Sequence, residues 1–292
     1  MIADADSAVG GPRQSVQADD NDPNFADENG RHDYRAAIQM SEAARDCAIA
    51  FWFTGGDAYA SCAVEILHHW TLDGDTYMKP TVDIEKNSTT IEQQITIPAF
   101  MYAASFVRGH SAWEAYDGSE PWENGSASDA EAAFQEWVRD RHRTFESTRP
   151  SFCEYNNKWA WRITDRAATG AYLQNDTYVK QAREMYRTQR ATTCPDGSTR
   201  LRPWNDFRNG DGPHAYGNSA EPDKNAYFNH ELSRSTAFGY TAYNLKAFAL
   251  AATVFDAYDG SDLWGFNAPE TTTVAPRYTR GSTGSRSMSK TP

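Results

Sequence analysis

Two segments of the chain combine side chains that can take up a proton with side chains that can hold a negative charge. The first is residues 155–162 (YNNKWAWR), and the second is residues 229–245 (NHELSRSTAFGYTAYNL). An ionised tyrosine can remove a proton from carbon, and amide N–H groups and a guanidinium stabilise the anion that results. The two segments lie about eighty residues apart, so the fold must bring them together.

These segments carry a resemblance to the alginate lyase superfamily of helical-toroid polysaccharide lyases, which includes mannuronate and glucuronan lyases. The resemblance spans most of residues 33–258 and is sharpest in the paired Asn and in the ELSR…Y..YNL run. It implies cleavage of a uronic-acid polymer by β-elimination, with no metal or other cofactor. Carried over by position, it makes Tyr240 the base and acid, Asn157 the neutraliser of the substrate carboxylate and Arg234 its helper.

The sequence departs from the alginate-lyase pattern directly after the Asn pair, where Lys158 stands in place of a His. The departure makes a glucuronan-type substrate nearly as plausible as polymannuronate. His214 and His230 lie in the long polar stretch before Arg234, and either is a candidate for the neutralising role or for an alternative base.

Further contacts with the sugar chain are expected from side chains in and near the two segments. Flat aromatic rings stack on the C–H faces of pyranose rings, and Asn156 is expected to support Asn157. The candidates for lining sugar subsites are Asn156, Lys158, Trp159, Trp161, His230, Tyr243 and Gln94.

Elimination explains why these residue types are needed. The C5 proton of a uronate is hard to remove while its carboxylate is charged, because removal pushes more negative charge onto that carboxylate. Preplaced amide donors and a cation stabilise such charge. A phenol acts as a base only when ionised, its unperturbed pKa is near 10, and a nearby arginine lowers such a pKa.

Helix geometry constrains how the second segment is built. Arg234 and Tyr240 are six positions apart, which places them about 120° apart around a regular helix. Both can face one cleft only if Arg234 lies in a loop or first turn. The regular helix is therefore expected to begin near Ser235, with Ser235 or Thr236 as its cap.

Three other interpretations remain open. A glycoside hydrolase on a similar toroid would need two opposed carboxylates, and the available ones are Asp165, Asp206, Asp211 and Glu231. A toroid that binds polysaccharide without cleaving it is favoured by the Lys158 departure. In structural terms, Tyr240 belongs to a helical stripe with Tyr243, so it could also be a core residue.

The elements that must position these side chains are helices, and we expect an all-α fold: an incomplete (α/α) toroid, or barrel, of antiparallel helical hairpins. Apolar residues recur at three- and four-residue spacing in several ranges, whereas alternating strand-like runs are scarce. The predicted helices cover residues 34–53, 57–70, 91–107, 127–145, 159–173, 176–190 and 231–257.

An internal similarity supports repeated hairpins. Thr54-Gly55 is followed by Asp57, and Thr169-Gly170 is followed by Asp176, with the same spacing from a later Tyr to Ala and Glu. The similarity predicts that a helix ends at each Thr-Gly pair and that an Asp caps the next helix. The toroid domain is predicted to cover residues 32–270, after a flexible lead-in over 1–31 and before a flexible tail over 271–292.

Composition limits the classes of partner. The formal net charge is −12, which argues against nucleic acid, and no run is apolar enough to span a membrane. We expect a monomer that binds an anionic polysaccharide through a small basic cleft on an acidic body. Cys47, Cys62, Cys153 and Cys194 lack metal-binding spacing, so their even number fits one or two disulfides in a secreted or periplasmic protein.

Overall fold

The computed structural model describes residues 2–15, 32–80, 89–118, 129–148, 157–188, 192–193, 199–200 and 237–263. These residues are helical apart from loops and one antiparallel pair of two-residue strands, β1 (Thr192–Thr193) and β2 (Thr199–Arg200). The helices are α1 (Ile2–Ala8), α2 (His32–Thr54), α3 (Asp57–Thr71), α4 (Thr89–Phe106), η1 (Ser111–Ala115), α5 (Ala130–Thr148), α6 (Asn157–Tyr172), α7 (Asp176–Thr188) and α10 (Ala237–Asp259).

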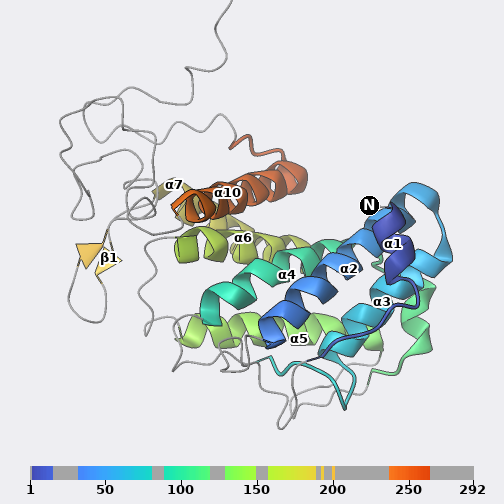
Figure 1. Ribbon diagram of the computed structural model, residues 1–292. Coiled ribbons are helices and arrows are strands. Elements are labelled where there is room, and N and C mark those ends of the chain that lie inside the picture. Colours follow the sequence, from blue (N-terminus) through green and yellow to red (C-terminus); the bar gives the residue numbers. More distant parts are fainter. Residues whose placement is uncertain are drawn as a thin grey trace, which may run out of the picture.

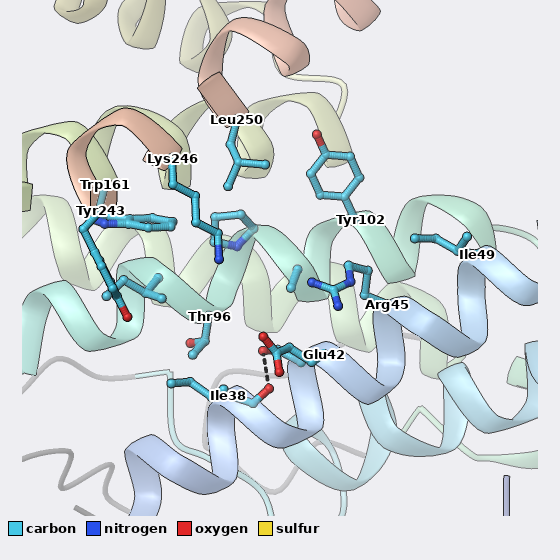
Figure 2. Close-up of a pocket in the computed structure, with 14 residues that line it drawn as sticks. Ile38, Glu42, Arg45, Ile49, Thr96, Tyr102, Trp161, Tyr243, Lys246 and Leu250 are labelled. Atoms are coloured by element: carbon cyan, nitrogen blue, oxygen red, sulfur yellow. Dashed lines mark hydrogen bonds between the residues drawn. The ribbon is translucent and has the colours of Figure 1, made fainter. Parts of the chain in front are cut away.

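Four long helices form a continuous inner layer. The most extensive packing joins α2 to α4, α4 to α6 and α6 to α10, and Figure 1 shows these helices following one another across the molecule in this order. In Figure 2 the chain runs in one direction along α2 from Ile38 to Ile49 and along α10 from Tyr243 to Leu250. Parallel inner helices require antiparallel connecting helices outside them, which is the (α/α) toroid expected from the sequence.

The connecting helices are tied to the inner layer as hairpins. α2 ends at Thr54, and Gly55 follows at φ +69, the left-handed conformation that glycine adopts at helix ends. A disulfide between Cys47 and Cys62 joins α2 to α3. At the second hairpin, a Cβ on Gly170 of α6 would lie 2.9 Å from the backbone nitrogen of Val179 in α7. These two helices therefore approach each other more closely than a larger residue allows.

The helix end predicted from the repeat is correct at the first Thr-Gly pair and wrong at the second. α6 does not stop at Thr169-Gly170 but continues to Tyr172, because these residues are buried between neighbouring helices. Neither Asp is a cap: Gly56 occupies the cap position of α3, and the side chain of Asn175 accepts a hydrogen bond from Tyr178 N at the start of α7.

The expectation of an irregular lead-in is wrong for residues 2–8, which form α1. Ala5 is fully buried and its carbonyl lies 3.9 Å from Cys47 Sγ. Packing on α2 explains a helix in a segment too short to show a periodic pattern. Residues 16–31 and the predicted tail lie outside the described ranges.

Candidate active site

A pocket of about 330 Å³ lies on the inner face of the toroid, between α2, α4, α6 and α10. The lining residues of α2, α4 and α10 recur at helical spacing, so each of these helices turns one stripe toward the same space, and α6 adds one residue. They are Ile38, Ser41, Glu42, Arg45 and Ile49 of α2, Ile95, Thr96, Pro98, Ala99 and Tyr102 of α4, Trp161 of α6, and Tyr243, Lys246 and Leu250 of α10.

Two cations from opposite walls meet in this pocket. Figure 2 shows the guanidinium of Arg45 and the ammonium of Lys246 directed into the space between α2 and α10. Glu42 supplies the only carboxylate among the lining residues. The lining residues therefore carry two cations against one carboxylate, and Arg45 is also paired with Asp46 at 2.9 Å.

Aromatic side chains shape the rest of the pocket. Trp161 packs edge-on against Tyr243, with ring centroids 5.9 Å apart. Burial raises the pKa of Tyr102, so its hydroxyl keeps its proton and can donate a hydrogen bond. The pocket thus offers both flat apolar surface and hydrogen-bonding groups to a sugar.

The register between α6 and α10 brings the two predicted segments together. Thr164 Oγ1 donates to the carbonyl of Ala247, 83 positions later, and Trp161 contacts Tyr243, 82 positions later. The two offsets differ by only one residue, which means that the two helices run parallel. Carried back by one turn, this offset puts Asn157 level with Gly239 and Tyr240 along the helix axes.

The predicted site residues within the described ranges fall into two groups. Trp161 and Tyr243 line the pocket, and Asn157 and Tyr240 lie one turn nearer the amino ends of α6 and α10. Asn157 is buried, Tyr240 and Lys158 are half-buried, and Tyr243 is exposed.

Trp159 and Gln94 are buried and are not among the lining residues of this pocket. Trp159 packs instead against the guanidinium of Arg162. Arg234, His214, His230 and Asn156 lie outside the described residues, as do the predicted caps Ser235 and Thr236. Helix α10 is described from Ala237 onward, so the predicted start near Ser235 lies outside the described residues.

Sequence reasoning missed Arg45, Lys246, Glu42 and Tyr102. A signal was present for α2, because Glu42 and Arg45 interrupt the stripe that begins at Ile38 and ends at Ile49. Charged residues within an otherwise apolar stripe indicate a face that meets solvent or ligand. Nothing in the sequence alone indicates that α10 faces this stripe.

One carboxylate proposed for a hydrolase has a structural role. Asp165 is fully buried and receives two hydrogen bonds from Arg141 Nη1, at 2.6 and 2.7 Å. Burial raises the pKa of Asp165 despite this cation. Asp165 does not line the pocket, so it is not placed for glycoside hydrolysis there.

Comparison with known proteins agrees with this architecture. The sequence matches the family model described as alginate lyase over residues 7–202 and 220–276. The chain belongs to the alginate lyase family. As a member it is a polysaccharide lyase.

A solved structure shares the fold of this family member. The crystal structure of an alginate lyase from Bacteroides ovatus superposes with a TM-score of 0.62 at 17% sequence identity, covering 91% of this chain and 71% of that chain. No curated protein matched the sequence.

Two further features of the described residues bear on the class of site. None of their helices is both long and apolar enough to cross a membrane. Within the same residues, no three His, Cys, Asp or Glu side chains come together as metal ligands would.

Proposed function

We propose that the chain cleaves a uronic-acid polymer, alginate or glucuronan, by β-elimination, with Tyr240 as base and acid. In this reaction the phenolate oxygen of Tyr240 takes the C5 proton of the uronate. The C4–O bond breaks as the C4–C5 double bond forms, and Tyr240 returns the proton to the leaving oxygen. Asn157, with Arg234 from the same segment as Tyr240, stabilises the charge that builds up on the carboxylate.

The observation that carries the proposal is the parallel register of α6 and α10. It supports a site in which Asn157 and Tyr240 face each other across neighbouring helices. Tyr240 is half-buried rather than sealed in the core, which suits a residue that must reach substrate. The pocket begins one turn further along the same helices, at Trp161 and Tyr243.

The direction of the inner helices adds an electrostatic argument. Because α2, α4, α6 and α10 run parallel, their amino ends gather at the end of the toroid that holds Asn157 and Tyr240. The amino end of a helix carries a partial positive charge of about half an elementary charge. Such an end favours a substrate carboxylate, even on a protein with net charge −12.

We propose that the protein works outside the cytoplasm, where long anionic polysaccharides occur. The disulfide between Cys47 and Cys62 supports this location, because disulfides persist in oxidising compartments.

The experiment is an absorbance assay on polymannuronate, polyguluronate, glucuronan and hyaluronan, since only elimination leaves an unsaturated sugar that absorbs in the ultraviolet. We expect activity on a mannuronate or glucuronate polymer, and we expect it to survive a metal chelator. Tyr240→Phe should lower kcat by at least about a thousandfold.

Tyr258→Phe is the matched control, because it removes a hydroxyl from the same helix at a residue that does not line the pocket. It should retain most of the wild-type kcat. If Tyr240→Phe stays as active as Tyr258→Phe, the assignment of the base is wrong. If no polymer yields an absorbing product although the protein binds it, the chain binds polysaccharide without cleaving it.

A further inference from the structure

The pocket is distinct from the pair of residues to which we assign the chemistry. Lys246 is six positions beyond Tyr240 on α10, which is about 9 Å along the helix axis and about 120° around it. This separation exceeds the width of one pyranose ring. A sugar whose carboxylate reaches Lys246 is therefore a different sugar from the one that loses its proton at Tyr240.

Arg45 and Lys246 each have hydrogen-bond donors that remain available to a ligand. Arg45 uses Nε and Nη2 on Asp46 Oδ1, at 3.0 and 2.9 Å, so its Nη1 is left for another acceptor. Lys246 forms no ion pair with any residue that the structure describes. Both side chains point into the pocket from opposite walls (Figure 2), and an anion placed between them would be held from two sides.

The remaining lining suits a sugar better than a small inorganic anion. Tyr102, Leu250 and Ile49 provide apolar surface on either side of the cations, and such surface packs against the C–H faces of a pyranose ring. A pocket of about 330 Å³ lies within the size range of ligand sites and has room for a sugar ring with its carboxylate.

We propose that this pocket is a uronate subsite, in which Arg45 and Lys246 hold the carboxylate of a sugar that neighbours the one being cleaved. The proposal rests on the proposed function for the identity of the polymer. Its consequence is selectivity, because the enzyme binds the carboxylates of two successive sugars of the polymer. Asn157 binds one carboxylate and the pocket binds the other. Neither cation takes part in the proton transfer.

Removing the charge of Glu42 should change substrate affinity in the opposite direction from removing either cation. Its carboxylate lines the same pocket one turn before Arg45, so it repels a bound uronate and limits the affinity. Removing that charge should strengthen binding, whereas removing either cation should weaken it.

The test measures KM and kcat on the polymer that the wild-type protein cleaves best. Lys246→Met and Arg45→Met should each raise KM by roughly tenfold, because a hydrogen bond to a charged group is lost. Their kcat should stay within about twofold, since transition-state contacts are intact. Arg45→Lys should recover most of the affinity, and Glu42→Gln should lower KM.

Lys180→Met is the matched control, because Lys180 is an exposed lysine on the outer helix α7. It should leave both constants unchanged. The proposal is overturned if Lys246→Met and Arg45→Met keep the wild-type KM, or if their kcat falls while their KM does not rise. Thermal unfolding of each variant shows whether a loss reflects misfolding.

Direct binding separates this proposal from the proposed function. Calorimetry with polymannuronate or glucuronan oligosaccharides, on the wild-type protein and on Tyr240→Phe, needs no turnover. The oligosaccharide should bind both proteins, and Lys246→Met should weaken it in each. An oligosaccharide with its carboxylates reduced to alcohols should bind poorly and equally to all. Equal binding of charged and reduced oligosaccharides would contradict the subsite even if the lyase is active.

Discussion

At the scale of single residues, buried charges hold α5 against α6. Arg141 and Asp165 are each almost fully buried, and Arg162 pairs with Glu146 at 2.9 Å close by. Charges taken out of water are tolerated only when each has its partner. The outer helix α5 is therefore positioned by these pairs as much as by apolar packing.

Asp165→Ala should be strongly destabilising, because it leaves the guanidinium of Arg141 buried without its carboxylate. We expect a loss of about 3–5 kcal/mol in the free energy of unfolding, measured with urea. The double variant Asp165→Leu with Arg141→Met should recover much of this loss, since it buries no charge. A single variant as stable as the wild type would show that water reaches the pair.

His142 should make stability depend on pH in the mildly acidic range. Burial, together with Arg141 and other arginines, lowers the pKa of His142 to about 3, although Glu146 opposes the shift. The unfolded chain takes up this proton near pH 6.5, whereas the folded chain does so only near pH 3. The contribution of neutral His142 to the free energy of unfolding is therefore complete above about pH 6.5 and is lost as the pH falls toward 3.

His142→Phe keeps a ring against Tyr178, which His142 contacts at 4.3 Å between centroids. Urea unfolding at pH 7 and pH 5 should show a smaller loss of stability on acidification for the variant than for the wild type. Equal losses in the two proteins would mean that other groups, such as Glu146, carry the acid sensitivity.

At the scale of elements, the approach of α6 to α7 depends on one glycine. Gly170→Ala puts a methyl group 2.9 Å from Tyr178 Cβ and from Val179 N, so the helices must move apart. We expect a cost of about 1–3 kcal/mol, seen as a lower Tm. Gly239→Ala in α10 meets nothing within 4 Å and should stabilise the helix slightly. Similar Tm values for the two variants would contradict this account.

The helices were predictable because their apolar stripes are long and regular. The predicted 34–53 and 57–70 agree closely with α2 and α3. α1 was missed because a seven-residue helix gains its stability from packing on α2 rather than from its own pattern. The predicted range 159–173 ends close to the observed end of α6 at Tyr172. Only the end inferred from the Thr-Gly repeat was misplaced, because Gly170 serves here as a point of close contact between helices.

The candidate site was only partly predictable, for a related reason. Asn157, Trp161 and Tyr243 belong to two recognisable segments, so their proximity could be expected. Arg45 and Lys246 belong to helices almost two hundred residues apart, and their convergence follows from the order of helices around the toroid. The local sequence of each helix does not indicate that order.

At the scale of the whole molecule, charge should make substrate binding respond to salt in two phases. The body carries −12 and repels a polyanion at long range, whereas Arg45 and Lys246 attract it at short range. The screening length falls from about 30 Å at 0.01 M salt to about 8 Å at 0.15 M and about 3 Å at 1 M.

We therefore expect KM to fall between about 0.01 and 0.15 M salt, as the long-range repulsion is screened, and to rise toward 1 M as the pocket weakens. Steady-state kinetics across this range test the expectation, with Lys246→Met as the variant that should lose most of the rise. A KM that increases steadily from the lowest salt would show that attraction dominates at every distance.

The pocket's two walls also have a consequence for synthesis. One wall is α2 and the other is α10, near opposite ends of the chain. During translation the hairpin of α2 and α3 can form early, because its contacts are local. The second wall does not exist until the ribosome has passed residue 259. A nascent or truncated chain can thus be largely helical and still unable to bind a polysaccharide in the pocket.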